Sequence, residues 1–217
     1  MNDIVFTTRR NDISGTWHID PSLPRPSSQD RIGRIPRRFR RASDLSPNVA
    51  FSSRHGAIRA SLALSGTSLE SPKALMRMTT RTGNMHIDVF QKGPERYVDI
   101  DAYSRRGNII VLLPHNFKGM IELGSRRGRM DILPSLAKTA RILKATDDRL
   151  LILVGAIETF PSDSILSDHC QLYSRSGNLC VGFSGQDTAP VPEMSLWKKL
   201  EGLFSKDRVD LSQAVPP

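Results

Sequence analysis

The chain has 217 residues and a formal net charge of +9, with 38% hydrophobic and 24% charged residues. This length and composition predict one domain with a packed core plus tails, and they exclude a chain too polar to fold. No apolar run approaches the roughly 18 residues that a membrane helix needs, so we expect no transmembrane segment.

The first twenty residues, 1–20, predict an initial strand or hairpin. Two hydrophobic stretches flank a turn near Asn11. Trp17 has the same parity as Ile13 and Ile19, so we expect it to cover the first repeat of the domain that follows. We therefore expect this segment to cap the fold.

Residues 21–47 differ in composition from the rest of the chain. Prolines and serines are mixed with six arginines between positions 31 and 41. Prolines and like charges both oppose packing, so we predict a mobile basic linker. Its candidate contacts for an acidic protein, a nucleic acid or an anionic membrane are Arg37, Arg38, Arg40 and Arg41. The alternative interpretation is a solvated, charged loop.

The domain from residue 48 to residue 183 contains a four-residue phrase five times. The phrase is a Ser or Thr, an arginine, any residue and a glycine, and its glycines are Gly56, Gly83, Gly107, Gly128 and Gly177. Apolar residues alternate with polar ones on both sides of each phrase, which is the period of a β-strand. Each phrase therefore predicts two short strands joined by a tight corner. We expect the glycine to adopt a backbone angle that residues with a Cβ avoid.

The spacing of the glycines indicates stacked repeats. The intervals are 27, 24, 21 and 49 residues, and the last is about two periods long. We therefore expect a sixth unit that has lost its phrase, with strands at 141–145 and 149–154 around an acidic turn. Repeats of this length are typical of solenoids and stacked arrays. The predicted fold is all-β, a β-solenoid or two-sheet roll of about six two-strand repeats, and an antiparallel array of hairpins is the alternative.

Stacking would place the phrase arginines in a column on one edge of the domain. Neighbouring strands lie about 4.8 Å apart. The column consists of Arg54, Arg81, Arg105, Arg126 and Arg175. Guanidinium groups bind phosphate, sulfate and carboxylate through forked hydrogen bonds. The alternative is a column without a ligand, because like charges about 5 Å apart in water repel by only about 0.8 kcal/mol. We expect the phrase hydroxyls to satisfy backbone groups of the corners.

The C-terminal tail, residues 184–217, begins with a polar linker. Apolar residues at helical spacing predict a short amphipathic helix at 194–204. Such a helix either folds back over its own domain or lies on a membrane or in a partner groove.

Two cysteines do not form a disulfide framework. Cys170 lies on the apolar side of its strand and Cys180 has the opposite parity, so we expect both to be reduced and Cys170 to lie in the core. The N-terminus lacks a basic start followed by an apolar stretch and so indicates no secretory signal. Together these features predict an intracellular protein, cytoplasmic or nuclear.

Motifs of enzyme chemistry are missing from the sequence. The five histidines show no metal-ligand spacing. There is no phosphate-binding loop, dinucleotide fingerprint or nucleophile elbow. We therefore expect no enzyme activity, no catalytic residues, no cofactor and no metal site.

Two stretches carry a resemblance to a known family. The opening from Ile13 to Pro21, and the strand ending in Leu112-Leu113-Pro114 before Phe117-Lys118-Gly119, resemble an uncharacterised fungal family of unknown function whose repeats read Ser-x-Asn-Gly. The repeat is also similar to that of a bacterial adhesin-like β-repeat domain. The resemblance covers residues 11–183 and departs from the family at the position before each glycine. It implies an all-β repeat module with no established activity.

These observations predict a non-enzymatic β-repeat scaffold or binding module that engages acidic partners through a basic edge. One alternative is a nucleic-acid or anionic-membrane binder that acts through residues 31–41 and 194–204. Another is a purely structural, self-assembling module.

Overall fold

The computed structural model describes most of the chain and shows two β-sheets. The described residues are 4–21, 47–66, 73–155 and 167–188. The first seven strands are β1 (Ile4–Thr8), β2 (Ile13–Ile19), β3 (Val49–Ser53), β4 (Ile58–Leu64), β5 (Lys73–Thr80), β6 (Met85–Lys92) and β7 (Tyr97–Ser104). The others are β8 (Ile109–Leu113), β9 (Gly119–Ser125), β10 (Met130–Ile132), β11 (Ala140–Ala145), β12 (Arg149–Val154), β13 (Asp168–Ser174) and β14 (Leu179–Phe183), and helix α1 spans Pro134–Ala137.

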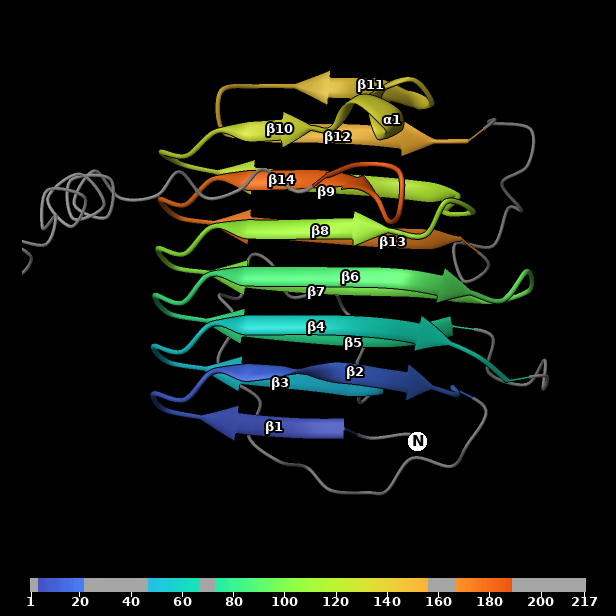
Figure 1. Cartoon of the computed structure of the whole chain (residues 1–217). Coiled ribbons are helices and arrows are strands. Elements are labelled where there is room, and N and C mark those ends of the chain that lie inside the picture. Colours follow the sequence, from blue (N-terminus) through green and yellow to red (C-terminus); the bar gives the residue numbers. More distant parts are fainter. Residues whose placement is uncertain (1–3, 22–46, 67–72, 156–166, 189–217) are drawn as a thin grey trace, which may run out of the picture. The chain divides into compact units, whose positions relative to one another are not determined.

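The strands form two sheets that lie face to face (Figure 1). The eight-stranded sheet has the order β1-β3-β5-β7-β13-β9-β12-β11, and the six-stranded sheet has the order β10-β14-β8-β6-β4-β2. We call a pair of consecutive strands joined by one tight corner, with one strand in each sheet, a repeat unit. The predicted all-β fold is confirmed. No helix in the described ranges is long and apolar enough to cross a membrane.

Strands of successive units pair in parallel, with equivalent positions in register. The hydroxyl residue of one unit lies beside that of the next, as in the pair Ser53 and Thr80 and the pair Thr80 and Ser104. An array of antiparallel hairpins would pair consecutive strands with each other, so this alternative is wrong. The corners consequently line up along one side of the domain, the left side of Figure 1.

The N-terminal segment is a repeat unit, so the hairpin alternative for it is wrong. β1 and β2 lie in different sheets and pair in parallel with β3 and β4. Thr8 lies beside Ser53, which makes Thr8-Arg9-Arg10-Asn11 a further copy of the corner phrase with asparagine in place of glycine. Trp17 covers the second unit, because its ring packs on Phe51 with centroids 4.6 Å apart.

The segment predicted as a sixth unit forms two strands but not a repeat unit. β11 and β12 pair antiparallel with each other, and β12 pairs antiparallel with β9 in the same sheet. Thr146 and Arg149 exchange backbone hydrogen bonds of 2.8 and 3.4 Å across the turn. A two-residue loop of this kind returns the chain beside itself rather than into the facing sheet. The hairpin therefore extends the eight-stranded sheet only.

The last unit, β13–β14, is inserted between two units that are consecutive in the chain. β13 lies between β7 and β9, and β14 lies between β8 and β10. Asp168 at the start of β13 accepts hydrogen bonds from the backbone N–H of Val98 at 2.8 Å and of Lys118 at 2.7 Å. Its carboxylate also pairs with Lys92, and both side chains are buried. Through these hydrogen bonds and this ion pair, Asp168 connects β13 to its neighbours β7 and β9 at the end of the strand opposite the corner.

The core lies between the two sheets and consists of the inward-facing residues of every unit. Cys170 belongs to this core with no exposed surface, as predicted, whereas Cys180 lies outside the core cluster although it is buried. Both cysteines are free. Burial raises the pKa of the Cys170 thiol well above its ordinary value and that of Cys180 to about 11. Neither thiol is therefore a reactive nucleophile at neutral pH.

Two predicted segments lie outside the described residues. They are most of the basic linker, with Arg37, Arg38, Arg40 and Arg41, and the amphipathic helix at 194–204.

Candidate functional site

Each corner is held by the hydroxyl that opens its phrase. The side-chain oxygen accepts a hydrogen bond from the backbone N–H three residues later, as Ser104 does from Gly107 at 2.7 Å. The equivalent distances in the other units are 2.9 Å for Ser53, 3.0 Å for Thr80, 2.9 Å for Ser125, 2.8 Å for Ser174 and 3.1 Å for Thr8. Because the hydroxyl satisfies the corner backbone, the adjacent arginine is set at the same place in every unit.

The corner glycines are required by space and not by backbone angle. Positive φ angles in the described residues occur at Gly66, Gly155 and Gly185, so the predicted reason is wrong. A Cβ on Gly107 would lie 1.8 Å from the carbonyl oxygen of Gly83 in the neighbouring unit. A Cβ on any of the other corner glycines would lie 1.9 or 2.0 Å from the equivalent carbonyl oxygen. Asn11 is tolerated because it belongs to the first unit of the stack.

A ladder of hydrogen bonds also connects the residues that directly follow the corner glycines. The side-chain oxygen of Asn84 accepts a hydrogen bond from the backbone N–H of Asn108 at 3.0 Å, and Asn108 accepts one from Asn178 at 2.9 Å. Asn178 accepts one from Arg129 at 3.0 Å. This ladder follows the spatial order of the units and not their order in the chain.

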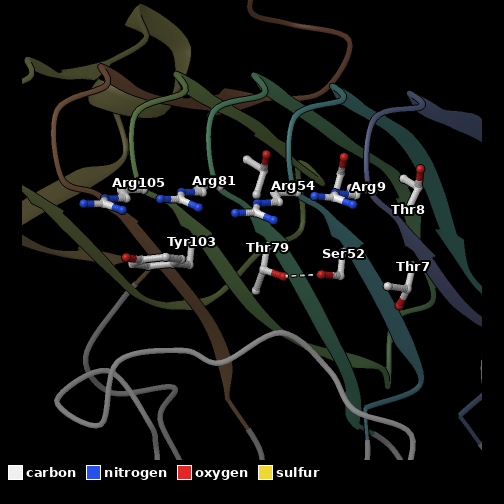
Figure 2. A pocket seen from close by; sticks show the side chains of 11 residues that line it. Thr7, Thr8, Arg9, Ser52, Arg54, Thr79, Arg81, Tyr103 and Arg105 are labelled. Atoms are coloured by element: carbon white, nitrogen blue, oxygen red, sulfur yellow. Dashed lines mark hydrogen bonds between the residues drawn. The ribbon is translucent and has the colours of Figure 1, made fainter.

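Four corner arginines line one open groove of about 500 Å³ (Figure 2). They follow the neighbouring strands β1, β3, β5 and β7 of the eight-stranded sheet, and they are Arg9, Arg54, Arg81 and Arg105. Figure 2 shows these side chains following one another in a row. Parallel pairing in register sets this row, at the strand spacing of about 4.8 Å.

A second row of side chains runs beside the arginines, two residues earlier in each strand. Thr7, Ser52 and Thr79 are small hydroxyl residues, and Tyr103 follows them at the end of the row (Figure 2). Thr79 and Ser52 share a side-chain hydrogen bond of 3.1 Å. Tyr103 stacks on Tyr173 of the inserted strand, with ring centroids 5.7 Å apart and an interplanar angle of 7°.

The groove has a positive lining. None of the described residues that line it is acidic. Arg9, Arg54 and Arg81 are exposed, and their guanidinium groups form no ion pair with another described residue. Unpaired arginines that share a groove with hydroxyl donors form an arrangement that can hold anionic oxygens.

Cationic groups farther along the same sheet are paired. Arg77 lies 3.5 Å from Asp101, and Lys73 lies 3.4 Å from Asp99. His169 also approaches Asp99, at 3.3 Å. The positive lining is therefore a local property of the corner region rather than of the whole sheet face.

A family model for a domain of unknown function, DUF7330, matches residues 2–186. The chain belongs to this family. The matched range contains every strand of the described structure, including the inserted unit β13–β14. No curated protein and no solved structure matches the chain.

The predicted column of this DUF7330 domain divides into two parts. Arg54, Arg81 and Arg105 line the groove, whereas Arg175 and Arg126 continue the row beyond Tyr103. The inserted unit also changes the order, because Arg175 precedes Arg126 in space.

Sequence reasoning missed Arg9 and the second row of the DUF7330 groove. The signal for Arg9 was Thr8-Arg9-Arg10-Asn11, which matches the phrase once asparagine is accepted at the first corner. The second row, including Thr79 and Tyr103, has no signal of its own, because its residues differ in type and become neighbours only through the register.

Metal binding finds no support in the described residues, where no three His, Cys, Asp or Glu side chains gather.

Proposed function

We propose that this DUF7330 domain is a β-solenoid binding module that holds an anionic ligand along its corner arginines. The observation that carries the proposal is the groove lined by Arg9, Arg54, Arg81 and Arg105 together with hydroxyl groups and without an acidic side chain. Four cations from four units converge on one surface, which favours a ligand with several negative charges.

The solenoid description is supported by the path of the chain. Each repeat unit adds one strand to each sheet, and its neighbours pair in parallel in the same register. The domain departs from a simple solenoid at the inserted unit and at the β11–β12 hairpin. The inserted unit adjoins the groove only at its Tyr103 end, and the hairpin lies beyond the inserted unit.

The energetics favour reversible, salt-sensitive binding. Neighbouring arginines about 5 Å apart in water repel by about 0.8 kcal/mol, so the empty row is only slightly unfavourable. An anion between two guanidinium groups replaces this repulsion by charge-assisted hydrogen bonds. Arg9, Arg54 and Arg81 are exposed and Arg105 is half-buried, so salt screens most of the interaction.

The composition of the groove favours binding over catalysis. Its lining provides guanidinium and hydroxyl groups but no imidazole, carboxylate or thiol among the described residues. General acid–base catalysis relies on a group whose pKa lies near the working pH. We therefore propose a non-enzymatic module.

The test is binding of labelled anionic ligands, measured by fluorescence anisotropy at increasing salt. The panel contains a sulfated oligosaccharide, RNA, duplex DNA and acidic liposomes. We expect the Arg54→Ser/Arg81→Ser variant to lose binding near physiological salt. The control variant Arg141→Ser/Lys144→Ser changes the same charge on the exposed β11 strand and should bind as the unchanged protein does. Equal losses in the two variants would contradict a site at the groove.

Self-assembly is a second candidate function, supported by the first unit. Phe6 is 47% exposed, and β1 has a partner on one side only among the described strands. An exposed apolar edge strand favours pairing with another chain. Sedimentation of the unchanged protein and of Phe6→Lys tests this, and a monomer at all concentrations would contradict it. Residues 31–41 of the predicted basic linker and the amphipathic helix predicted at 194–204 offer nucleic-acid or membrane binding as a further proposal, on residues outside the described structure.

A further inference from the structure

The groove is closed at one end by two tyrosines. At the position two residues before each arginine, the first three units carry small side chains, Thr7, Ser52 and Thr79. The next two units carry Tyr103 and Tyr173 at this position, and their rings stack nearly parallel. The space beside the arginines therefore ends at Tyr103, which Figure 2 shows at the end of the row.

The other end of the groove lies at the edge of the sheet. Thr7 belongs to β1, and no described strand pairs with β1 on its outer side. An extended ligand lying along the groove thus reaches from the edge at Thr7 to the tyrosine at the far end. A groove with one closed end accepts the end of a chain and not its middle.

The tyrosines separate the corner arginines into two sets. Arg9, Arg54, Arg81 and Arg105 lie beside the groove. Arg175 and Arg126 have the same phrase and continue the same row, but the position beside Arg175 is filled by Tyr173, which is 7% exposed. Arg175 and Arg126 therefore serve as controls for the groove arginines, because they are the same residue type at the same position of the corner.

We propose that the groove binds the end of an acidic oligosaccharide, with about one sugar residue for each of the four arginines. The inference rests on the proposed function and names its ligand class. One sugar ring with its linkage is comparable in length to the strand spacing of about 4.8 Å, so charges on successive sugars meet successive arginines. Sulfate and carboxylate groups suit the guanidinium forks.

The second row fits the uncharged part of such a ligand. The hydroxyls of Thr7, Ser52 and Thr79 both donate and accept hydrogen bonds, as sugar hydroxyls do. The arginine row thus binds the charged groups of the oligosaccharide, and the adjacent hydroxyl row binds its hydroxyl groups. A simple inorganic anion would use the arginines alone.

A single-stranded nucleic acid fits the lining less well. Proteins that bind single strands place aromatic side chains under successive bases. Among the described residues that line the groove, Tyr103 is the one aromatic side chain, and it lies at the closed end. The units that carry Thr7, Ser52 and Thr79 offer no ring on which a base could stack.

The experiment is a length series of labelled heparin-derived oligosaccharides, from disaccharide to decasaccharide, titrated by anisotropy near physiological salt. We expect affinity to rise up to about the tetrasaccharide and then stay constant. Each oligosaccharide has one end that enters the groove in the correct direction, so sugars beyond the fourth add no further contact. Arg81→Ser should weaken binding about tenfold, and Arg175→Ser should weaken it less than twofold. The matched pair changes the same residue type at the same corner position.

A double variant tests the closed end. Tyr103→Ser/Tyr173→Ser extends the small side chains to Arg175, so the plateau should move to longer oligosaccharides. Thermal unfolding shows whether this variant keeps the fold, and the length series on the unchanged protein decides the question if it does not.

The outcomes are distinguishable. Affinity that keeps growing with chain length, with equal effects of Arg81→Ser and Arg175→Ser, overturns the end-binding inference and leaves anion binding along the row in place. Tighter binding of RNA than of every oligosaccharide overturns the ligand class. No binding of any anion overturns the proposed function itself.

Discussion

The hydroxyl of Ser174 donates a hydrogen bond of 3.1 Å to the carbonyl oxygen of Gly107, although 67 residues separate them in the chain. Ser125 donates an equivalent bond to Gly177 at 3.1 Å. These contacts place the last repeat unit between two units that are consecutive in the chain. The fifth unit, β9–β10, therefore pairs with neighbours that are synthesised after it. Contacts between distant residues slow folding, so we expect the inserted unit to be the late step.

The order of the units can be tested by engineered disulfides at the corners. Arg106 and Ser176 occupy equivalent positions of adjoining units, so Arg106→Cys/Ser176→Cys should form a disulfide on mild oxidation. A disulfide needs Cα atoms within about 7 Å, and neighbouring strands lie about 4.8 Å apart. Mass spectrometry after proteolysis identifies the bond. Arg106→Cys/Arg127→Cys, two strand spacings apart, should not crosslink, and the reverse result would show that the units stack in chain order.

The corner glycines should not tolerate alanine. Gly107→Ala places a Cβ 1.8 Å from a backbone carbonyl oxygen, which cannot move without separating two units. We expect the free energy of unfolding to fall by about 3 kcal/mol or more, as in severe overpacking. Urea unfolding measures the change. The control is Gly93→Ala, where the nearest atom to the new Cβ is a flexible Arg96 side-chain carbon at 3.3 Å. Similar losses at both sites would contradict the stacking explanation.

The buried pair of Lys92 and Asp168 should show strong coupling. Lys92→Met leaves a carboxylate with no exposed side-chain surface and without its cation, which costs about 3–5 kcal/mol. Burial already raises the pKa of Asp168, although Lys92 and two backbone N–H groups partly offset this effect. The double variant Lys92→Met/Asp168→Asn removes both charges and keeps one amide oxygen, which can accept from the N–H of Val98 or of Lys118 in place of the two carboxylate oxygens.

Urea unfolding of the two single variants and the double variant gives the coupling energy of this pair. We expect the double variant to be more stable than Lys92→Met alone. Additive losses would show that the two charges do not depend on each other.

Asp187 should make stability fall at acidic pH. Burial alone would raise its pKa, but hydrogen bonds from the backbone N–H groups of Phe183, Ser135 and Leu136 lower it below 3.8. A carboxylate with a lowered pKa contributes stability above pH 3.8, and the contribution is lost as pH falls through the folded-state pKa.

The measurement is the free energy of unfolding of the unchanged protein and of Asp187→Asn between pH 7 and pH 2. Asparagine resembles the protonated acid, so the difference should be constant near neutrality and shrink below pH 3.8. Asp147→Asn, on an exposed turn, serves as the control variant. A difference that grows on acidification would contradict the prediction.

The local pattern of the sequence determined the strands, the corners and the row of arginines. Alternation of apolar residues around each phrase depends on the two-residue period of a strand, which is a local property. The phrase itself sets one corner geometry, so its arginines align once the strands pair in register. For this reason Arg54, Arg81 and Arg105 could be assigned to one edge before the structure was known.

Only the tertiary structure decided which unit lies beside which. The corner phrase and the inward-facing apolar positions are similar in every unit, so the register alone does not distinguish one neighbour from another. A weak signal existed in the residue after each glycine, since Asn178 continues the ladder and Arg129 ends it. Its meaning depends on hydrogen bonds between units that are distant in the chain.

The groove also belongs to the tertiary structure. Thr79 and Tyr103 have unremarkable sequence contexts, and they become the side and the end of one groove because their strands are adjacent. The same holds for Asp168, whose partners Lys92, Val98 and Lys118 meet only where the last unit is inserted. Local periodicity sets what each unit looks like, and packing between units that are distant in the chain sets which side chains share a site.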